Sequence, residues 1–534
     1  MNTSRRKLLL AGLGAAQVAL VERFTGRSAL AGPTPTGPTK LLCIWIDGGC
    51  NWEHFFSPLS AAGIDKFIRP PEGGNHPFGY SKEMVRNFDG TAADLQDSTL
   101  TRKLRGPVSW NDANPADTTG SNTLSGGAQI YRPWGYSWID PKFKLYEKAC
   151  LLVGADQGTA SHASGIVASM SGVAGSSFRS PAVQAVIANY MATYFPDRPV
   201  PNATLGGILP AALGLPSLAT PYSLSSLTLV ESTVSDRRNA AWDGLRDRTM
   251  VDMPSFDGVS PGQTLPLTAT DAALMEAIRA RKGLSAKGTD DMYRQLYETY
   301  AGISKTIARD VLTQLEATKG FEVLNMDPLY SMGPFKTACI GSADICGPVQ
   351  SGGPYDFALR LLKSDLVTSL TLRTTSIANT GFDVHFSGGA RAQTSHLRIA
   401  FEAIGQMLNE MSVTPAKSGT GTLLDETLVY IYSDFGRTFA RSGEDGTDHH
   451  PATCGLLVGG GIKGNQMLGG YDESAMGSPL GAPVNLIEES GAKVKRPPTS
   501  QDIAATVIRA FGLQPGKDFF IPGGYGEFEG AIGV

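Results

Sequence analysis

The sequence predicts an α/β fold with a central, largely parallel sheet flanked by helices. Short apolar runs rich in β-branched and aromatic residues recur along the chain, and helical stretches lie between some of them. Runs that are apolar at every position suit strands buried on both faces, and strands that alternate with helices are typical of parallel sheets. The 63 glycines and 33 prolines among 534 residues predict many turns and long loops, which argues against a helical bundle.

The apolar runs and helical stretches give an order of elements along the chain. Buried strands are expected at 40–46, 149–154, 367–373, 428–433 and 454–458. Helices are expected at 180–193, 392–411 and 500–511, and a longer one at 289–318. We expect one domain over 40–534, in which the stretches at about 55–140 and 200–340 are loop-rich and helical insertions.

The N-terminal segment has the pattern of an export signal. Arg5 and Arg6 precede an apolar run from Leu8 to Val21, and small residues follow up to Ala31. A twin arginine before a short apolar stretch and a small-x-small site is typical of twin-arginine signals. The run is shorter than the roughly 20 residues that span a bilayer.

We therefore expect residues 1–31 to be a cleaved twin-arginine signal, read by the export machinery, and 32–39 to be a linker. The mature protein is expected in the periplasm or outside the cell, without a stable membrane span. An uncleaved membrane anchor is the alternative.

Charge and cysteine content exclude some classes of protein. Lys and Arg number 46 and Asp and Glu number 50, so no basic surplus exists to neutralise a nucleic-acid backbone, and we expect no nucleic-acid partner. Six cysteines are too few for a disulfide scaffold. Cys339 and Cys346 could close a small ring. Buried thiols are expected at the other positions, Cys43, Cys50, Cys150 and Cys454.

Acids and histidines stand beside the ends of the expected strands. These residues are Asp47, His162, Asp383, His385, Asp434 and His449. In sheets with parallel strands, functional groups gather in the loops at the carboxyl ends. Several carboxylates in one pocket raise one another's pKa unless a cation neutralises them, and mixed oxygen and nitrogen ligands suit zinc or manganese. The pattern predicts a divalent-metal centre, although a turn or capping role is open for each acid taken alone.

Several motifs together resemble a known family. They are Trp45-Ile-Asp-Gly-Gly49, Thr159-Ala-Ser-His162, Gly381-Phe-Asp-Val-His385, Ser433-Asp-Phe-Gly-Arg-Thr438, Gly446-Thr-Asp-His449 and the closing helix from Asp502 to Leu513. These motifs resemble the alkaline-phosphatase-like superfamily, which includes the sulfatases, and within it the domain of unknown function 1501 family. The resemblance implies the fold of that superfamily and a core that holds two divalent ions, without distinguishing zinc, manganese, magnesium and calcium.

The resemblance also implies roles for individual residues. By position, Asp47 and Asp434 would hold one ion, and Asp383, His385 and His449 would hold the other. The Asp-His pair that usually ends the metal-binding strand reads Asp434-Phe435 here. One histidine ligand is therefore missing unless another replaces it, and the candidates are His162 and His450.

The nucleophile in relatives is a Ser or Thr at a helix N-terminus, or a formylglycine in the sulfatases. Thr159, Ser161 and Ser164 are the candidates in this chain. The sulfatase Cys-x-Pro-x-Arg signature is absent. Arg437 could hold the substrate anion with its fork of donors, or it could form an ion pair with a neighbouring carboxylate.

Together, these observations predict an exported metal-dependent hydrolase that acts on a small anionic phosphate or sulfate ester. One alternative is a catalytically inactive fold relative that acts as an extracellular binding or assembly protein. A metal-dependent transferase that uses the same ions is another.

Overall fold

The structure is a computed structural model, and it describes a subset of the chain. The described residues are 35, 37–68, 80–96, 101–107, 137–172, 182–191, 194–195, 198, 200–205, 314–315, 317–321, 354–374, 382–385, 389–439, 446–475, 479–513 and 524–533. The expected signal at 1–31, the Cys339–Cys346 pair and most of the 200–340 insertion lie outside these residues, as does its expected helix at 289–318 apart from 314–315 and 317–318.

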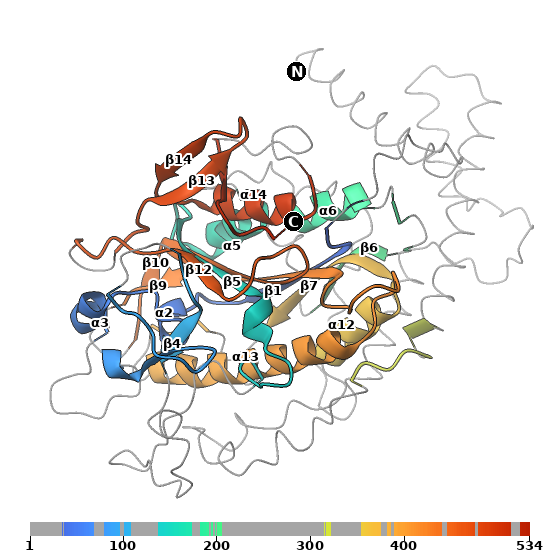
Figure 1. The fold of residues 1–534 in the computed structure, drawn as a ribbon, viewed down its shortest axis with the longest axis horizontal. Coiled ribbons are helices and arrows are strands. Elements are labelled where there is room, and N and C mark those ends of the chain that lie inside the picture. Colours follow the sequence, from blue (N-terminus) through green and yellow to red (C-terminus); the bar gives the residue numbers. More distant parts are fainter. Residues whose placement is uncertain are drawn as a thin grey trace, which may run out of the picture.

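An eight-stranded mixed sheet forms the centre of the molecule (Figure 1), in the order β3-β12-β5-β11-β8-β1-β7-β6. Its strands are β1 (Lys40–Ile46), β3 (Thr101–Arg102), β5 (Ala149–Asp156), β6 (Val200–Leu205), β7 (Val367–Thr374), β8 (Thr427–Ser433), β11 (Ala452–Gly459) and β12 (Gln466–Gly469). All five strands expected from the sequence are among them, so the α/β prediction is confirmed.

The prediction of a largely parallel sheet was wrong. β8, β1, β7 and β6 are parallel neighbours, but β11 runs antiparallel between β5 and β8. Two neighbouring strands can run parallel only if the chain between them crosses back to the end of the sheet at which the first strand began. Between β8 and β11 the described chain forms only a short pair of strands, β9 (Gly436–Arg437) and β10 (His449–His450), so β11 starts at the edge where β8 ends. Both kinds of strand are apolar when buried on both faces, so composition did not reveal the direction.

Helices cover both faces of the sheet (Figure 1). One face carries α12 (Pro354–Lys363) and α13 (Gly389–Val413), and the other carries α5 (His162–Ser171), α6 (Val183–Met191) and α14 (Ser500–Ala510). Successive residues of β1 alternate between the two cores: Leu42 and Ile44 pack in the first, and Leu41 and Cys43 in the second. The helices expected at 180–193, 392–411 and 500–511 correspond to α6, α13 and α14.

Smaller elements surround the main sheet. They are a three-stranded sheet of β13 (Val484–Glu488), β14 (Lys493–Arg496) and β15 (Gly526–Phe528), a pair of β2 (Val85–Asn87) and β4 (Arg105–Pro107), the helices α2 (Trp52–Phe55) and α3 (Ala61–Phe67), and two short 3-10 helices, η1 (Lys82–Met84) and η2 (Leu145–Lys148). The four cysteines expected as thiols are free and buried. None of the described helices combines the length and apolar character needed to cross a membrane.

Candidate metal centre

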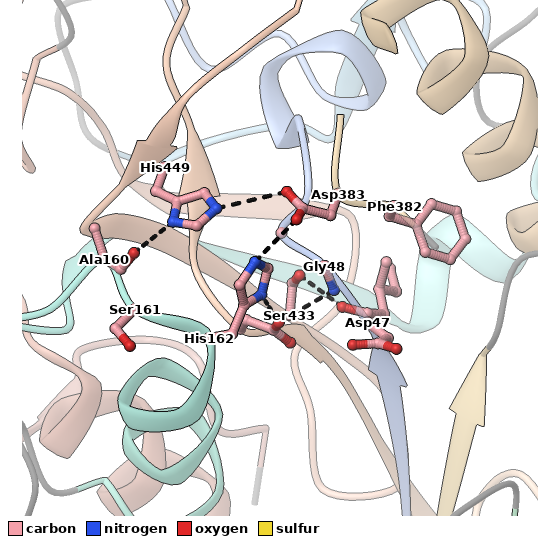
Figure 2. Close-up of polar contacts among 12 residues, drawn as sticks. Asp47, Gly48, Ala160, Ser161, His162, Phe382, Asp383, Ser433 and His449 are labelled. Atoms are coloured by element: carbon pink, nitrogen blue, oxygen red, sulfur yellow. Dashed lines mark hydrogen bonds and ion pairs between the residues drawn. The ribbon is translucent and has the colours of Figure 1, made fainter. Parts of the chain in front are cut away.

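One rim of the main sheet collects polar side chains from distant parts of the sequence (Figure 2). β1, β7 and β8 end at this rim, and β11 begins there because it runs in the opposite direction. His449 precedes β11 and pairs with Arg437, which lies just after β8. The antiparallel strand therefore brings His449 to the edge at which Asp434 lies.

Two glycines let the segments of the rim approach closely. Gly48 has a φ of +105°, and a Cβ on it would lie 2.5 Å from the backbone nitrogen of Asp383. A Cβ on Gly165, in the first turns of α5, would lie 2.2 Å from the carbonyl oxygen of Asp434. Only glycine fits at such distances and at that φ. The turn after β1 therefore packs directly on Asp383, and the start of α5 packs directly on Asp434.

Asp383 lies at the centre of three imidazoles, and Figure 2 shows two of them, those of His162 and His449, pointing toward it. His162 Nε2 is 3.3 Å from Asp383 Oδ2, and His449 Nε2 is 3.5 Å from Oδ1. His385 Nε2 is 3.0 Å from the same Oδ1. The Nε2 atoms of His385 and His449 are only 2.8 Å apart. The four side chains thus direct their ligand atoms into one small volume.

The other nitrogen of each imidazole is held by a group that accepts a hydrogen bond. The pairs are His162 Nδ1 with Asp434 Oδ2 at 2.7 Å, His385 Nδ1 with Asp448 Oδ1 at 3.0 Å and His449 Nδ1 with the Ala160 carbonyl at 2.7 Å. Carboxylate and carbonyl oxygens have no proton to donate, so each neutral ring carries its proton on Nδ1 and presents a lone pair at Nε2. Arg437 Nη1 lies 3.4 Å from His385 Nε2 and can donate to it, but no described residue donates to the Nε2 atoms of His162 and His449. Facing lone pairs repel, and a proton or a metal ion between them would remove the repulsion.

The pKa values of these groups differ in direction. The hydrogen bond with Asp434 raises the pKa of His162. Burial lowers the pKa of His449, and the positive charge of Arg437 adds to that effect. Burial by itself would raise the pKa of Asp383, but the hydrogen bond from Arg437 holds that pKa below its usual value. The centre therefore keeps an ionised carboxylate beside an imidazole that resists protonation.

These donors fit one metal ion. The ligand atoms of His162, Asp383 and His449 all lie within 4.8 Å of one another. Ligand atoms on one tetrahedral ion, at bond lengths of about 2.0 to 2.1 Å, stand about 3.3 Å apart. Side chains that ligate metals commonly have their second nitrogen held by a carboxylate or carbonyl, as all three imidazoles do here.

Asp434 and Asp47 do not fit a second ion in the same way. Asp434 is buried, and its Oδ1 accepts from Trp45 Nε1 at 2.5 Å while its Oδ2 accepts from Gly48 N at 3.1 Å and contacts His162. Asp47 forms an ion pair with Arg373, whose Nε lies 3.0 Å from Asp47 Oδ2. The carboxylates that the resemblance assigns to one ion are thus engaged by donors of the protein.

Arg437 forms the ion pair that the sequence left open as its second role. Its Nη2 lies 2.5 Å from Asp383 Oδ1 and also donates to the Gly48 carbonyl, and its Nη1 donates to Thr447 O at 2.9 Å. The side chain is fully buried. Arg437 therefore fixes the position of the Asp383 carboxylate.

The nucleophile candidates lie in the loop before α5. Ser161 is exposed at the N-cap position of the helix, and its backbone nitrogen donates to Thr159 Oγ1 at 3.2 Å. Ser164 is half-buried within the helix. In the part of the chain that the structure describes, no base accepts a hydrogen bond from the Ser161 hydroxyl.

The sequence assigned no role to three residues of this rim, although Trp45 and Asp448 lie within the quoted motifs. Trp45 and Asp448 hold Asp434 and His385, and Arg373 pairs with Asp47. Arg373 is a charged residue at the end of an apolar run, which is the signal that identified Asp47 and Asp434. Trp45 carried no such signal, because an aromatic residue in a buried strand is ordinary.

Comparison with known proteins gives one match. Residues 336–525 match the sequence model of the family described as "Protein of unknown function (DUF1501)", about a third of the chain. This segment includes Asp383, His385, Asp434, Arg437 and His449, and the match supports the resemblance to the domain of unknown function 1501 family. No curated protein and no solved structure matches the chain.

Proposed function

We propose that this protein is an exported metal-dependent hydrolase of phosphate or sulfate esters, with an alkaline-phosphatase-like fold. The observation that carries the proposal is the set of three imidazoles whose Nε2 lone pairs face Asp383 and one another. Such a set is incomplete without a cation. The twin-arginine pattern supports export. It also supports a metal site, because that route carries folded proteins, often with a metal already bound.

His162, Asp383 and His449 would hold the ion, with His385 at its edge. When bound, a divalent ion supplies a Lewis acid that activates water and stabilises charge on a transferring phosphoryl or sulfuryl group. The side chains of the three ligands are 39%, 44% and 24% exposed, so solvent reaches the centre. Three protein ligands with an open side are typical of catalytic metal sites, whereas structural sites are closed.

The chain's own residues position this centre. Asp434 and the Ala160 carbonyl orient the imidazoles of His162 and His449, so that both present Nε2. Arg437 keeps Asp383 ionised and in place. Two nitrogen ligands and one oxygen ligand favour zinc or manganese over magnesium and calcium. A second ion, which the resemblance implies, would share Asp47 with Arg373, which contacts only the Oδ2 atom of that carboxylate among the described contacts.

A second candidate is the inactive relative that serves as an extracellular binding or assembly protein. The observation that favours it is the Ser161 hydroxyl, which makes no hydrogen bond to a base among the described residues. If water is the nucleophile, this observation has no consequence for activity. The two candidates therefore differ in whether the protein hydrolyses an ester.

The test measures metal content and ester hydrolysis on the purified full chain. We expect zinc or manganese in the protein, and turnover of an aryl phosphate or an aryl sulfate that a chelator removes and the metal restores. Asp383→Ala should lower metal affinity by more than about 100-fold, because loss of an outer-shell partner already costs about 10- to 100-fold. Asp472→Ala is the matched control, since Asp472 is an exposed acid whose carboxylate accepts hydrogen bonds from Ser474. A folded chain without metal and without turnover would contradict the hydrolase proposal.

A further inference from the structure

We propose that Arg373, held by Asp47, binds a tetrahedral oxyanion group of the substrate beside the metal centre. The inference rests on the proposed hydrolase function and deepens it, because it assigns the subsite that would recognise a phosphate or sulfate group.

Arg373 is tied to the metal centre through Trp45. The two residues are neighbours in register on β7 and β1, and the guanidinium of Arg373 lies 4.9 Å from the centre of the Trp45 ring. The Trp45 indole donates to Asp434, which in turn holds His162. The Arg373 guanidinium therefore packs on the Trp45 ring, and the same indole positions Asp434, which holds the proposed ligand His162.

Asp47 links Arg373 to the same centre along the backbone. Phe382 N donates to the Asp47 carbonyl at 3.1 Å, and the next residue in each segment, Gly48 and Asp383, pack directly on each other. The Asp47–Arg373 ion pair therefore flanks Asp383 at the rim.

Arg373 has a hydrogen-bond donor that solvent can reach, whereas the one unpaired donor of Arg437 among the described contacts, its Nε, is buried. Arg373 uses Nε and Nη2 on a single oxygen of Asp47, its side chain is 31% exposed, and no described residue accepts from its Nη1. Arg437 is fully buried and donates to Gly48, Thr447 and Asp383. A guanidinium fork matches the oxygen atoms of phosphate and sulfate. Arg373 is therefore the guanidinium of this rim that an anionic substrate can reach.

Asp47 has a predictable effect on such binding. Its carboxylate fixes the guanidinium, but its negative charge also opposes an incoming anion. Removing the charge while keeping the shape, as in Asp47→Asn, should strengthen anion binding and leave metal content unchanged. If Asp47 were instead a metal ligand, the same change would release metal.

The experiment measures the affinity of the metal-loaded full chain for inorganic phosphate and for inorganic sulfate by calorimetry, with metal content determined on each sample. For the anion that binds more tightly, we expect at least a tenfold loss of affinity in Arg373→Met and a gain of severalfold in Asp47→Asn. Arg373→Lys keeps the charge and loses the fork, so it should fall between wild type and Arg373→Met. It also serves as the informative variant if Arg373→Met does not fold.

The outcomes separate the two proposals. Unchanged anion affinity in the folded Arg373 variants, or metal loss in Asp47→Asn, overturns the Arg373 subsite and leaves the hydrolase proposal standing. A wild-type chain that binds metal but neither anion also overturns the subsite. A wild-type chain that binds no metal overturns the proposed function, and the subsite with it.

Discussion

The polar and charged side chains at the two ends of β1 are paired in different ways. At its start, Lys40 pairs with Asp365 at 2.8 Å and with Glu426, and Arg198 pairs with Asp365 at 2.9 Å. At its end, the imidazoles of His162, His385 and His449 present Nε2 lone pairs to the Asp383 carboxylate or to one another. Both ends join residues far apart in the sequence and both contain ion pairs, but only at the second do imidazole Nε2 atoms, those of His385 and His449, face each other.

This difference distinguishes structural from functional polar residues better than residue type does. Lys40 and Arg198 are almost completely buried, and their charges are matched within the protein. The side chains of His162, Asp383 and His385 are about two-fifths exposed, and although Arg437 pairs with Asp383, no described residue donates to the Nε2 atom of His162. A buried, complete network stabilises the fold, whereas an accessible, incomplete one can take up a ligand.

The largest effect on stability is expected at the start of β1, where Lys40 pairs with Asp365 and Glu426. Lys40→Met would leave Glu426 buried without its cation, and breaking a buried ion pair by removing one partner costs about 3 to 5 kcal/mol. Denaturant unfolding should show this loss in the free energy of unfolding, with metal affinity unchanged. A loss of metal affinity in Lys40→Met would show that the two ends are coupled and would break the comparison.

Glu53 on α2 is a buried acid that forms no ion pair with a described residue. Burial raises its pKa from 4.5 to about 8. Between these values the folded chain keeps a proton that the unfolded chain has lost, so the stabilising contribution is complete below about pH 4.5 and is lost as the pH rises through 8.

Glu53→Gln should remove this pH dependence. Relative to wild type, the free energy of unfolding of the variant should rise by roughly 4 kcal/mol between pH 4.5 and pH 8. The measurement compares the pH slopes of the two proteins, so a constant cost of the buried amide cancels. Parallel slopes would mean that Glu53 is charged in the folded chain.

The smallest effect is expected at Asp434, which holds a ligand without being one in our proposal. Asp434→Asn would turn an amide N–H toward His162 Nδ1 or toward the Trp45 indole. In the first case the imidazole proton moves to Nε2, which can then no longer bind metal. We expect metal affinity to fall about 10- to 100-fold, as for other outer-shell partners, measured by competition with a chelating dye. A loss as large as that in Asp383→Ala would make Asp434 a ligand and would support the two-ion arrangement.

The sequence by itself determined which segments are buried and which polar residues interrupt them. Apolar runs located β1, β5, β7, β8 and β11, and acids or histidines beside their ends identified the residues that lie at one rim. This succeeded because burial on both faces of a sheet leaves a continuous apolar signal in the chain. The polar residues that follow such runs are then the ones exposed at its edge.

Only the tertiary structure decided the direction of β11 and the partner of each polar group. The apolar run of β11 is the same in either direction, and its direction follows from the path of the chain after β8. The contact of Trp45 with Asp434 joins positions separated by 389 residues, and no local pattern specifies such a pair. Which nitrogen of an imidazole is free depends on its neighbours in space, so the lone pairs that face Asp383 are a property of the folded chain.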